Sequence, residues 1–191
     1  MSLHVPEHFK IFRVMGFDPG VVNAGVSIID VDYTTKRLVS VTAFTLVPAR
    51  LDTYQNVYPG IDDSPINRIY RLTAAFRYLL EFYNPCAVAS EDAFYHPKMP
   101  NAYGVLRDVI MAVRNETHSY NYNIPFVLIE PRAVKKVVGA GIDGVDKKQL
   151  VKEAIRRKAE IMSVMQVDLN LLDQHAIDAI AVAYSMLFSS Q

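Results

Sequence analysis

Three segments in the first quarter of the chain have the pattern of buried β-strands, and short links join them. Residues 11–17 (IFRVMGF), 24–32 (AGVSIIDVD) and 37–47 (RLVSVTAFTLV) are rich in branched and aromatic side chains, which favour extended backbone. The turn sequence DPG follows the first segment directly. Because antiparallel strands can be joined by tight turns whereas parallel strands need a long crossover, we expect an antiparallel meander of three strands.

Helices alternate with single strands over the rest of the chain. Apolar periodicity and capping residues predict a helix over 64–83, a strand over 86–91, a helix over 101–117, a strand over 124–131, a basic loop, a helix over 146–161 and a last helix from about Asp173. The helix over 146–161 has Asp146 as its cap and Gln149 in the capping-box position. This order predicts an α/β fold with a five-stranded mixed sheet, its first three strands antiparallel, and helices on both faces.

Length and composition fit one compact domain over residues 1–191. The chain has 191 residues, of which 51% are hydrophobic, enough for a full core. Its single cysteine excludes a disulfide framework, as is typical of a reducing compartment. No apolar run approaches the roughly 20 residues that cross a membrane, and no signal-peptide pattern precedes the first strand. We therefore expect a cytoplasmic protein without membrane contact.

Four polar side chains fall at the ends of apolar elements. Asp18 ends the first strand, Glu91 ends the fourth, and His175 and Asp178 lie one turn apart at the start of the last helix. If these two strands are neighbours and the last helix crosses their ends, the four side chains converge and need a cation. Oxygen ligands of this kind suit Mg²⁺, and two such ions about 4 Å apart can catalyse phosphodiester hydrolysis.

Each of these residues also has a purely structural explanation. Asp18 precedes Pro-Gly and fits a turn residue. Glu91 fits an ordinary strand-end acid, and His175 fits a histidine at the core boundary. Asp173 is well explained as the cap of the last helix, so we leave it out of the expected site. Spacing alone does not decide between these explanations and a metal site.

Four motifs together resemble the RuvC family of Holliday-junction resolvases. They are GFDPGVVNAGVSIID, SEDAF, PRAVKKVVGAGIDGVDKKQLV and HAIDAIAVAY, and they occur in the family's order and spacing. The resemblance runs from about Ile11 to Leu187, which we take as the core of the domain. It implies a ribonuclease-H-like fold, a homodimer, and magnesium-dependent nicking of symmetric strands at a four-way DNA junction. Two Mg²⁺ ions are expected per site, and Mn²⁺ is expected to substitute for them.

The resemblance assigns roles to the acidic site residues and to one aromatic residue. Asp18 matches the family's first catalytic acid, Glu91 the second and Asp178 the last. His175 stands where some members have Asp and others His, and it is expected either to bind metal or to neighbour the attacking water. Phe94 matches an aromatic residue that stacks on bases at the junction centre. Its structural alternative is a core phenylalanine that anchors the loop.

Basic residues near the site are expected to bind DNA. Lys147 matches a catalytic lysine near the scissile phosphate, and Lys148 beside it is expected to contact DNA too. Either Lys135 or Lys136 matches a second basic residue, but the loop that follows differs in length from the bacterial pattern. From residue 130 to residue 160 the chain has nine basic and five acidic side chains, a net charge of +4. A local basic face of this kind can hold phosphates.

Several features depart from the bacterial members of the family. The whole chain is neutral, it has no long basic tail, and it has an extended loop over 48–64. These departures suggest a phage-like or otherwise divergent member, which would act in the host cytoplasm if a phage encodes it. Such an enzyme would cut branched DNA more broadly, and whether it works with a branch-migration motor cannot be inferred from the sequence.

Three other functions fit parts of the sequence. A flap or general branched-DNA endonuclease would use the same acids. A junction-binding protein that does not cut would have the same fold and basic segment, but it would need no acidic cluster beside DNA. An actin-like ATPase could hold a phosphate on FDPGVVNAG, yet it would leave Glu91, His175 and Asp178 unexplained.

Overall fold

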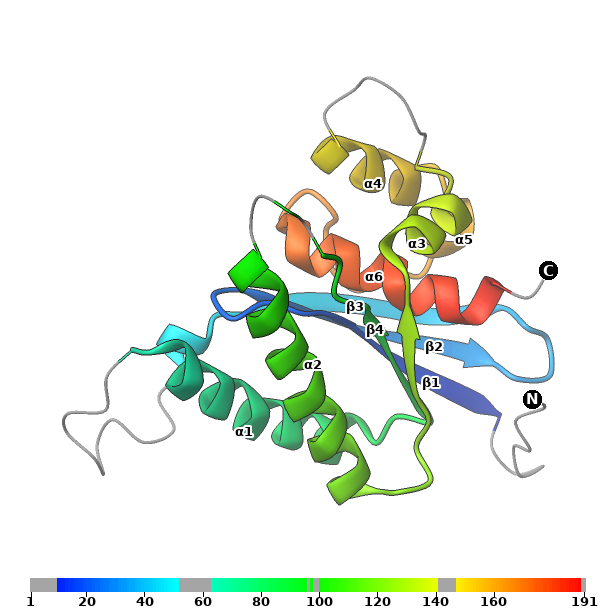
Figure 1. Ribbon diagram of the computed structural model, residues 1–191. Helices are drawn as coiled ribbons and strands as arrows, with labels where there is room; N and C mark the ends of the chain where they lie inside the picture. The colour runs from blue at the N-terminus through cyan, green and yellow to red at the C-terminus, as the bar shows by residue number, and fades with distance from the viewer. Residues whose placement is uncertain (1–9, 52–62, 96, 98–99, 141–146, 190–191) are drawn as a thin grey trace.

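One mixed β-sheet forms the centre of the molecule (Figure 1). The computed structural model describes residues 10–51, 63–95, 97, 100–140 and 147–189. The strands of the sheet are β1 (Ile11–Asp18), β2 (Ala24–Asp32), β3 (Leu38–Leu46), β4 (Ala87–Glu91) and β5 (Phe126–Ile129). Their order across the sheet is β3-β2-β1-β4-β5.

Strand β1 lies in the middle of this sheet and joins its antiparallel and parallel halves. It pairs with β2 in antiparallel register, and β2 pairs with β3 in the same way. On its other side β1 pairs with β4 in parallel register, and β4 pairs with β5. The expected antiparallel meander and the five-stranded mixed sheet are both confirmed.

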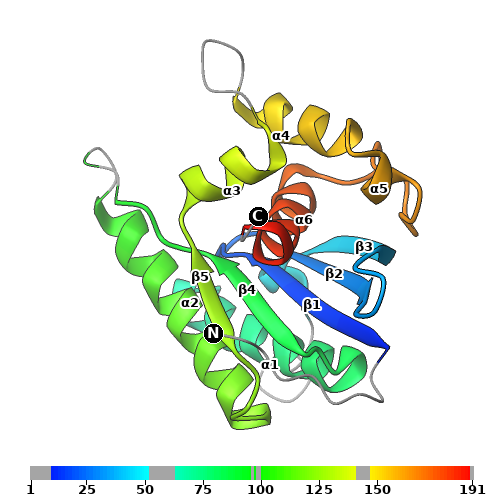
Figure 2. The same ribbon diagram turned by 90° about the vertical axis from the view of Figure 1, so that its right-hand side faces the viewer.

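Helices cover both faces of the sheet (Figures 1 and 2). They are α1 (Pro65–Tyr83), α2 (Pro100–Tyr120), α3 (Pro131–Val138), α4 (Lys147–Arg156), α5 (Ala159–Met162) and α6 (Gln174–Phe188), with a 3-10 turn, η1 (Pro48–Arg50). Helices α1 and α2 pack on one face. Helix α6 crosses the other face, and α3 and α4 pack outside it. None of the described helices is long and apolar enough to cross a membrane.

Each face of the sheet has its own hydrophobic core. The core under α1 and α2 includes Met15, Phe17 and Phe76, all fully buried, and the Phe17 and Phe76 rings meet edge to face at 5.3 Å. The core under α6 includes Val14 and Ile29. Side chains of β1 thus alternate between the two cores, which is why its sequence is apolar almost without interruption.

Two helical expectations differ from the structure. The basic loop expected after the fifth strand begins with a helix, α3, in which Pro131 follows the capping position of Glu130 and Gly139 ends the helix in the left-handed conformation (φ 77°). The helix expected over 146–161 is divided into α4 and α5, because Lys158 between them adopts extended backbone. The proposed cap Asp146 lies outside the described residues.

Helix α6 lies unusually close to β1 and β2. A Cβ atom on Gly16 would come within 2.3 Å of the Ala179 carbonyl oxygen, and one on Gly25 within 1.9 Å of the His175 carbonyl oxygen. The buried Ser27 hydroxyl donates a hydrogen bond of 2.8 Å to the same Ala179 carbonyl. Only glycine allows this approach, and it places the first turn of α6 directly over the ends of β1 and β2.

We predict that Gly25→Ala lowers the free energy of unfolding by roughly 2–4 kcal/mol, the scale of overpacked core substitutions. The added methyl group would overlap backbone atoms of α6, which cannot move aside like a flexible side chain. Urea denaturation would measure the change.

Gly104→Ala is the matched control, since a Cβ atom there meets no atom within 4 Å. Because alanine favours helix, this variant should be as stable as the wild type or up to about 1 kcal/mol more stable. Equal stability of the Gly25→Ala variant and the wild type would show that the close approach of α6 is not required.

Candidate active site

The site lies where β1 and β4 end side by side. Phe17 on β1 is in register with Ser90 on β4, so the next residues along the two strands, Asp18 and Glu91, are neighbours at the same edge of the sheet. A tight turn follows Asp18, in which a Cβ atom on Gly20 would come within 1.9 Å of the Asn23 carbonyl oxygen. The DPG sequence therefore turns the chain tightly after Asp18 and leaves the Asp18 carboxylate at the edge of the sheet.

The start of α6 faces these two acids from the other direction. Asp173 caps the helix by accepting a hydrogen bond of 3.0 Å from the Ala176 amide, and Thr45 on β3 donates a further hydrogen bond to the same carboxylate. These bonds hold the first turn so that His175 Nδ1 lies 2.8 Å from Asp18 Oδ2. The expected convergence of the last helix on the ends of β1 and β4 is present.

Burial is the largest cause of a rise in the pKa of Glu91 to about 8. The charges of Asp18 and Asp178 add to it, a hydrogen bond with Asp18 favours the protonated form, and the positive charge of Lys135 acts in the opposite direction. A carboxyl group with a pKa this high lacks enough positive charge and solvent around it to stabilise its ionised form.

Asp178 is affected in the same way, and its pKa rises to about 6. Burial comes first among the causes and repulsion by Asp18 second. Gln174 donates a hydrogen bond of 2.7 Å to Asp178 Oδ1, which stabilises the ionised form and offsets part of the rise. The sequence analysis did not identify Gln174, although its i,i+4 spacing from Asp178 was the signal for this contact.

His175 has its pKa raised, first by its hydrogen bond to Asp18 and then by the charges of Asp18, Asp173 and Asp178, against the opposing effect of burial. Its side chain is 40% exposed, whereas that of Asp18 is 13% exposed. The Nδ1 atom is engaged by Asp18, so Nε2 is the ring atom left to face a ligand or water.

The chemistry of this cluster fits a hard divalent cation. Three carboxylates supply oxygen ligands, and two of them have raised pKa values that a nearby positive charge would lower. Among the described side chains, no three His, Cys, Asp or Glu groups already surround a point at metal-binding distance. Binding of a cation would therefore require some of these side chains to move.

Lys135 on α3 is a basic residue whose charge acts on the acid cluster. Its charge lowers the pKa of both Glu91 and Asp178. Lys135 and Lys136 are both exposed. The effect on the two acids makes Lys135 a candidate to face a bound phosphate. Lys147 and Lys148 begin α4, but their side chains lie outside the described part of the structure.

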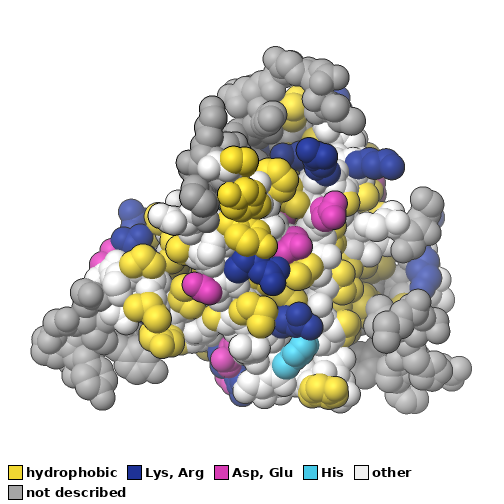
Figure 3. All heavy atoms as spheres, in the orientation of Figure 1, with side chains coloured by type: hydrophobic (Ala, Val, Ile, Leu, Met, Phe, Trp, Pro, Cys, Tyr) yellow, Lys and Arg dark blue, Asp and Glu magenta, His cyan; other side chains and the backbone are white. Residues whose placement is uncertain are grey.

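Other basic residues of the segment have structural partners. Arg156 donates a hydrogen bond of 2.9 Å to Asn170 and pairs with Glu153, and the Lys158 ammonium lies 4.8 Å from the centre of the Tyr184 ring. On the face seen in Figure 3, Lys and Arg side chains over the α3–α5 region are interspersed with acidic ones. These contacts give Arg156 and Lys158 a structural role that does not depend on DNA.

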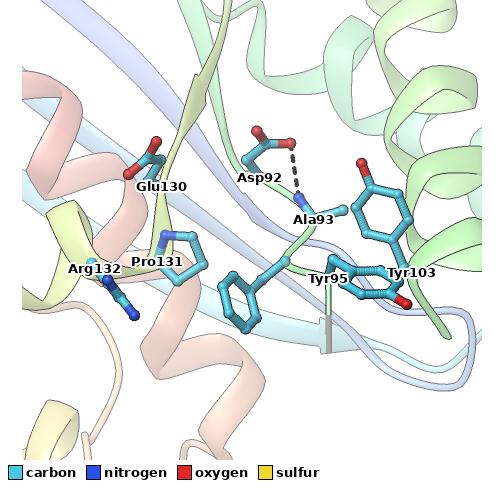
Figure 4. A pocket seen from close by; sticks show the side chains of 8 residues that line it. Asp92, Ala93, Tyr95, Tyr103, Glu130, Pro131 and Arg132 are labelled. Carbon is cyan, nitrogen blue, oxygen red and sulfur yellow. Dashed lines mark hydrogen bonds between the residues drawn. The ribbon is translucent and has the colours of Figure 1, made fainter. Parts of the chain in front are cut away.

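Phe94 is 59% exposed, so it is not a core residue that anchors the loop. It follows Glu91 by three residues and borders a cavity of about 400 Å³ between the β4–α2 connection and the start of α3. Figure 4 shows Tyr95 and Tyr103 on one side of this cavity and Pro131 and Arg132 on the other.

Comparison with known proteins gives a consistent result. The chain is 28% identical over 173 residues to the "Crossover junction endodeoxyribonuclease RuvC" of Roseiflexus sp., covering 90% of this chain and 88% of the relative. It is equally similar to the protein of that name from Chloroflexus aggregans, with 90% of each covered. No protein-family model matches the chain.

The fold agrees with solved resolvases. The Thermus thermophilus RuvC structure in complex with Holliday junction substrate superimposes with a TM-score of 0.58 at 16% identity, over 94% of this chain and 95% of that one. The yeast mitochondrial Holliday junction resolvase Ydc2 gives a TM-score of 0.62 at 16% identity, over 92% and 78%. The resemblance to RuvC and the ribonuclease-H-like fold are confirmed.

We predict that metal-free protein becomes less stable as pH rises from about 4.5 to about 8. A carboxyl group whose pKa is higher in the folded state than in the unfolded state binds its proton more tightly in the folded state. Its contribution to stability is complete at a pH below the pKa of the unfolded state, and it is lost as the pH rises through the pKa of the folded state. Glu91→Gln should weaken this dependence, leaving the contributions of Asp178 and His175, and raise the unfolding free energy at pH 8 by on the order of 2–3 kcal/mol.

Urea denaturation in EDTA at pH 5 and pH 8 measures the effect. Glu81→Gln is the control, since Glu81 is an exposed acid paired with Arg77 on α1, and it should leave the pH dependence unchanged. A Glu91→Gln variant with the pH dependence of the wild type would contradict the electrostatic description of the site.

Proposed function

We propose that this RuvC-like chain is a metal-dependent endonuclease that resolves four-way DNA junctions by paired, symmetric nicks. The observation that carries the proposal is the convergence of Asp18, Glu91, His175 and Asp178 at one edge of the sheet, where burial and the charge of Asp18 raise the pKa of both Glu91 and Asp178. A protein that only binds DNA gains nothing from carboxylates beside phosphates. The relatives and solved structures named above support the junction as substrate.

Asp18, Glu91 and Asp178 would hold the divalent cations, with Mg²⁺ as the expected ion. A bound pair of such ions would activate a water molecule and stabilise the leaving oxygen of the phosphodiester. Asp18 is the central ligand in this proposal because it interacts with each of the other three side chains. Gln174 would keep Asp178 oriented through its hydrogen bond.

His175 would act through Asp18. With Nδ1 against the Asp18 carboxylate, the imidazole orients that ligand and presents Nε2 toward the site. Lys135 would offset negative charge on the phosphate, as its influence on Glu91 and Asp178 suggests. Lys147, at the first position of α4, stays assigned to the scissile phosphate on the strength of the resemblance.

Two copies of the chain would act on one junction. A four-way junction has approximate two-fold symmetry, and a two-fold dimer would present its two sites to equivalent strands. Paired nicks at symmetric positions leave ends that ligase can seal. The homodimer, like the strictness for four-way junctions over flaps, belongs to this proposal.

We predict that the protein cuts a labelled four-way junction in Mg²⁺ and leaves a linear duplex intact. Asp18→Asn should lower the single-turnover rate by roughly 100-fold or more. Loss of one electrostatic contact to a transition state has an effect of this size. Denaturing gel electrophoresis of the junction, a flap and a duplex measures all three rates.

Asp32→Asn is the matched control, because Asp32 is an acid at the end of β2 whose carboxylate accepts hydrogen bonds from the amides of Thr34 and Thr35 in its own turn. It should cut like the wild type. Binding without cutting would remove the nuclease proposal, and equal cutting of all three substrates would remove the junction preference.

We also predict that the rate falls on acidification at a higher pH in the wild type than in His175→Asp. The pKa of His175 is raised above its ordinary value by Asp18, so the neutral imidazole is lost early as pH falls, and the cation that forms competes with metal for Asp18. The ordinary pKa of an aspartate, about 3.9, lies well below that of a histidine, so the loss of activity should shift to lower pH in the variant. Superimposable pH–rate profiles of the two proteins in Mg²⁺ would contradict this role.

A further inference from the structure

Gln174, the first residue of α6, contacts the acid cluster through Asp178. Its side-chain amide donates a hydrogen bond of 2.7 Å to Asp178 Oδ1. Within the described residues, Asp178 Oδ2 accepts no hydrogen bond, so it is the oxygen left for a cation. A carboxylate can bind a metal ion through one of its oxygens or through both. The contact with Gln174 therefore leaves Asp178 a single oxygen to offer.

The hydrogen bond between Gln174 and Asp178 is local to one helix. The two residues are four positions apart on α6, the spacing at which side chains on one face of a helix meet. The other acids of the cluster, Asp18 and Glu91, lie on separate strands. A shift of α6 against the strands can therefore alter contacts between elements without breaking this bond. It is a contact that can persist when a cation rearranges the side chains of the cluster.

The amide of Gln174 holds Asp178 without adding charge. A side-chain amide carries two N–H donors and no net charge. A lysine at this position would also donate, but its positive charge would compete with the cation. An ionised glutamate could not donate and would add a further negative charge. A neutral donor fixes one oxygen of Asp178 and leaves the negative charge of the cluster available for a cation.

A hydrogen bond of this kind also has a purely structural use. Side-chain pairs four residues apart stabilise a helix slightly, whatever the helix does. In this helix, however, the acceptor is a half-buried carboxylate of the acid cluster. A structural pair would affect the protein equally in the presence of any cation. A bond that fixes how Asp178 binds metal would affect cations according to the coordination that each requires.

Mg²⁺ and Ca²⁺ differ in the coordination that they accept. Mg²⁺ requires nearly octahedral geometry at about 2.0–2.1 Å and keeps several water molecules, so it takes few carboxylate oxygens. Ca²⁺ takes about six to eight oxygens at about 2.3–2.6 Å, and carboxylates often bind it through both oxygens. A carboxylate with one oxygen engaged by an amide therefore suits Mg²⁺ better than Ca²⁺.

We infer that Gln174 is a positioning residue that makes Asp178 a one-oxygen ligand and thereby favours Mg²⁺ over Ca²⁺ at this site. The inference rests on the proposed function, because it takes Asp178 as a ligand of the catalytic cations. It assigns part of the cation selectivity to a neutral side chain that does not itself bind the metal.

Thermal unfolding of the full-length, metal-free protein with added MgCl₂ or CaCl₂ at constant ionic strength tests the inference. A cation that binds the folded protein raises the unfolding temperature with its concentration, which gives its dissociation constant. In Gln174→Ala the dissociation constant of Mg²⁺ should rise roughly 10- to 100-fold, as when a metal ligand loses its hydrogen-bond partner. That of Ca²⁺ should rise less or fall, because Asp178 gains a second free oxygen.

Gln166→Ala is the matched control. Gln166 is an exposed glutamine whose side chain donates a hydrogen bond to the Val164 carbonyl beside β3, and its loss should leave both dissociation constants unchanged. Circular dichroism in EDTA should show that both variants are folded. Equal changes in the two dissociation constants in Gln174→Ala, or no change in either, would overturn the inference.

The same proteins are also assayed for cutting of a four-way junction in Mg²⁺. A cation preference that depends on Gln174, without cutting by the wild type, would support the inference and contradict the nuclease proposal. Cutting by the wild type, with the same cation preference in Gln174→Ala, would do the opposite. Stabilisation of the wild type by neither cation would overturn the inference whether or not the protein cuts.

Discussion

The close contact of helix α6 with strands β1 and β2 determines where the chemistry of this protein lies. Gly16 and Gly25 leave no room for a side chain between sheet and helix, and Ser27 bonds to the helix backbone. As a result the first turn of α6 lies over the end of β1, and His175 reaches Asp18. A side chain at either glycine would separate the helix from the sheet and with it the two halves of the site.

The convergence of the three acids has an electrostatic cost that the described side chains offset only in part. Glu91 and Asp178 have raised pKa values because they are partly buried beside Asp18, and one lysine, Lys135, acts against the repulsion from α3. Such a cluster destabilises the metal-free fold and gains most from a bound cation. Stability and function are therefore opposed at this edge of the sheet, as is common where carboxylates are kept for catalysis.

Local features of the fold could be predicted from the sequence, whereas its long-range contacts could not. The strands have apolar runs bounded by turns, and Asp173 is the helix cap that its position indicated. The meeting of Asp18 with His175 depends on strand order and helix crossing, which spacing does not contain. Helix α3 escaped prediction because it is short and basic, although Pro131 and Gly139 mark its two ends.

The charge pattern was similarly ambiguous. Nine basic residues between 130 and 160 looked alike in the sequence, but Arg156 and Lys158 are engaged by Asn170 and Tyr184. Lys135 on α3 acts on Glu91 and Asp178. Partners far apart in the chain decide which charges remain for DNA, and those partners appear only after folding.

The central claim is that Asp18, Glu91 and Asp178 bind the catalytic cations. Anomalous diffraction from crystals of the protein soaked in Mn²⁺ tests it most directly. The account predicts two manganese peaks at the ends of β1 and β4, bonded to these three carboxylates. Manganese bound elsewhere, with none at these carboxylates, would contradict it.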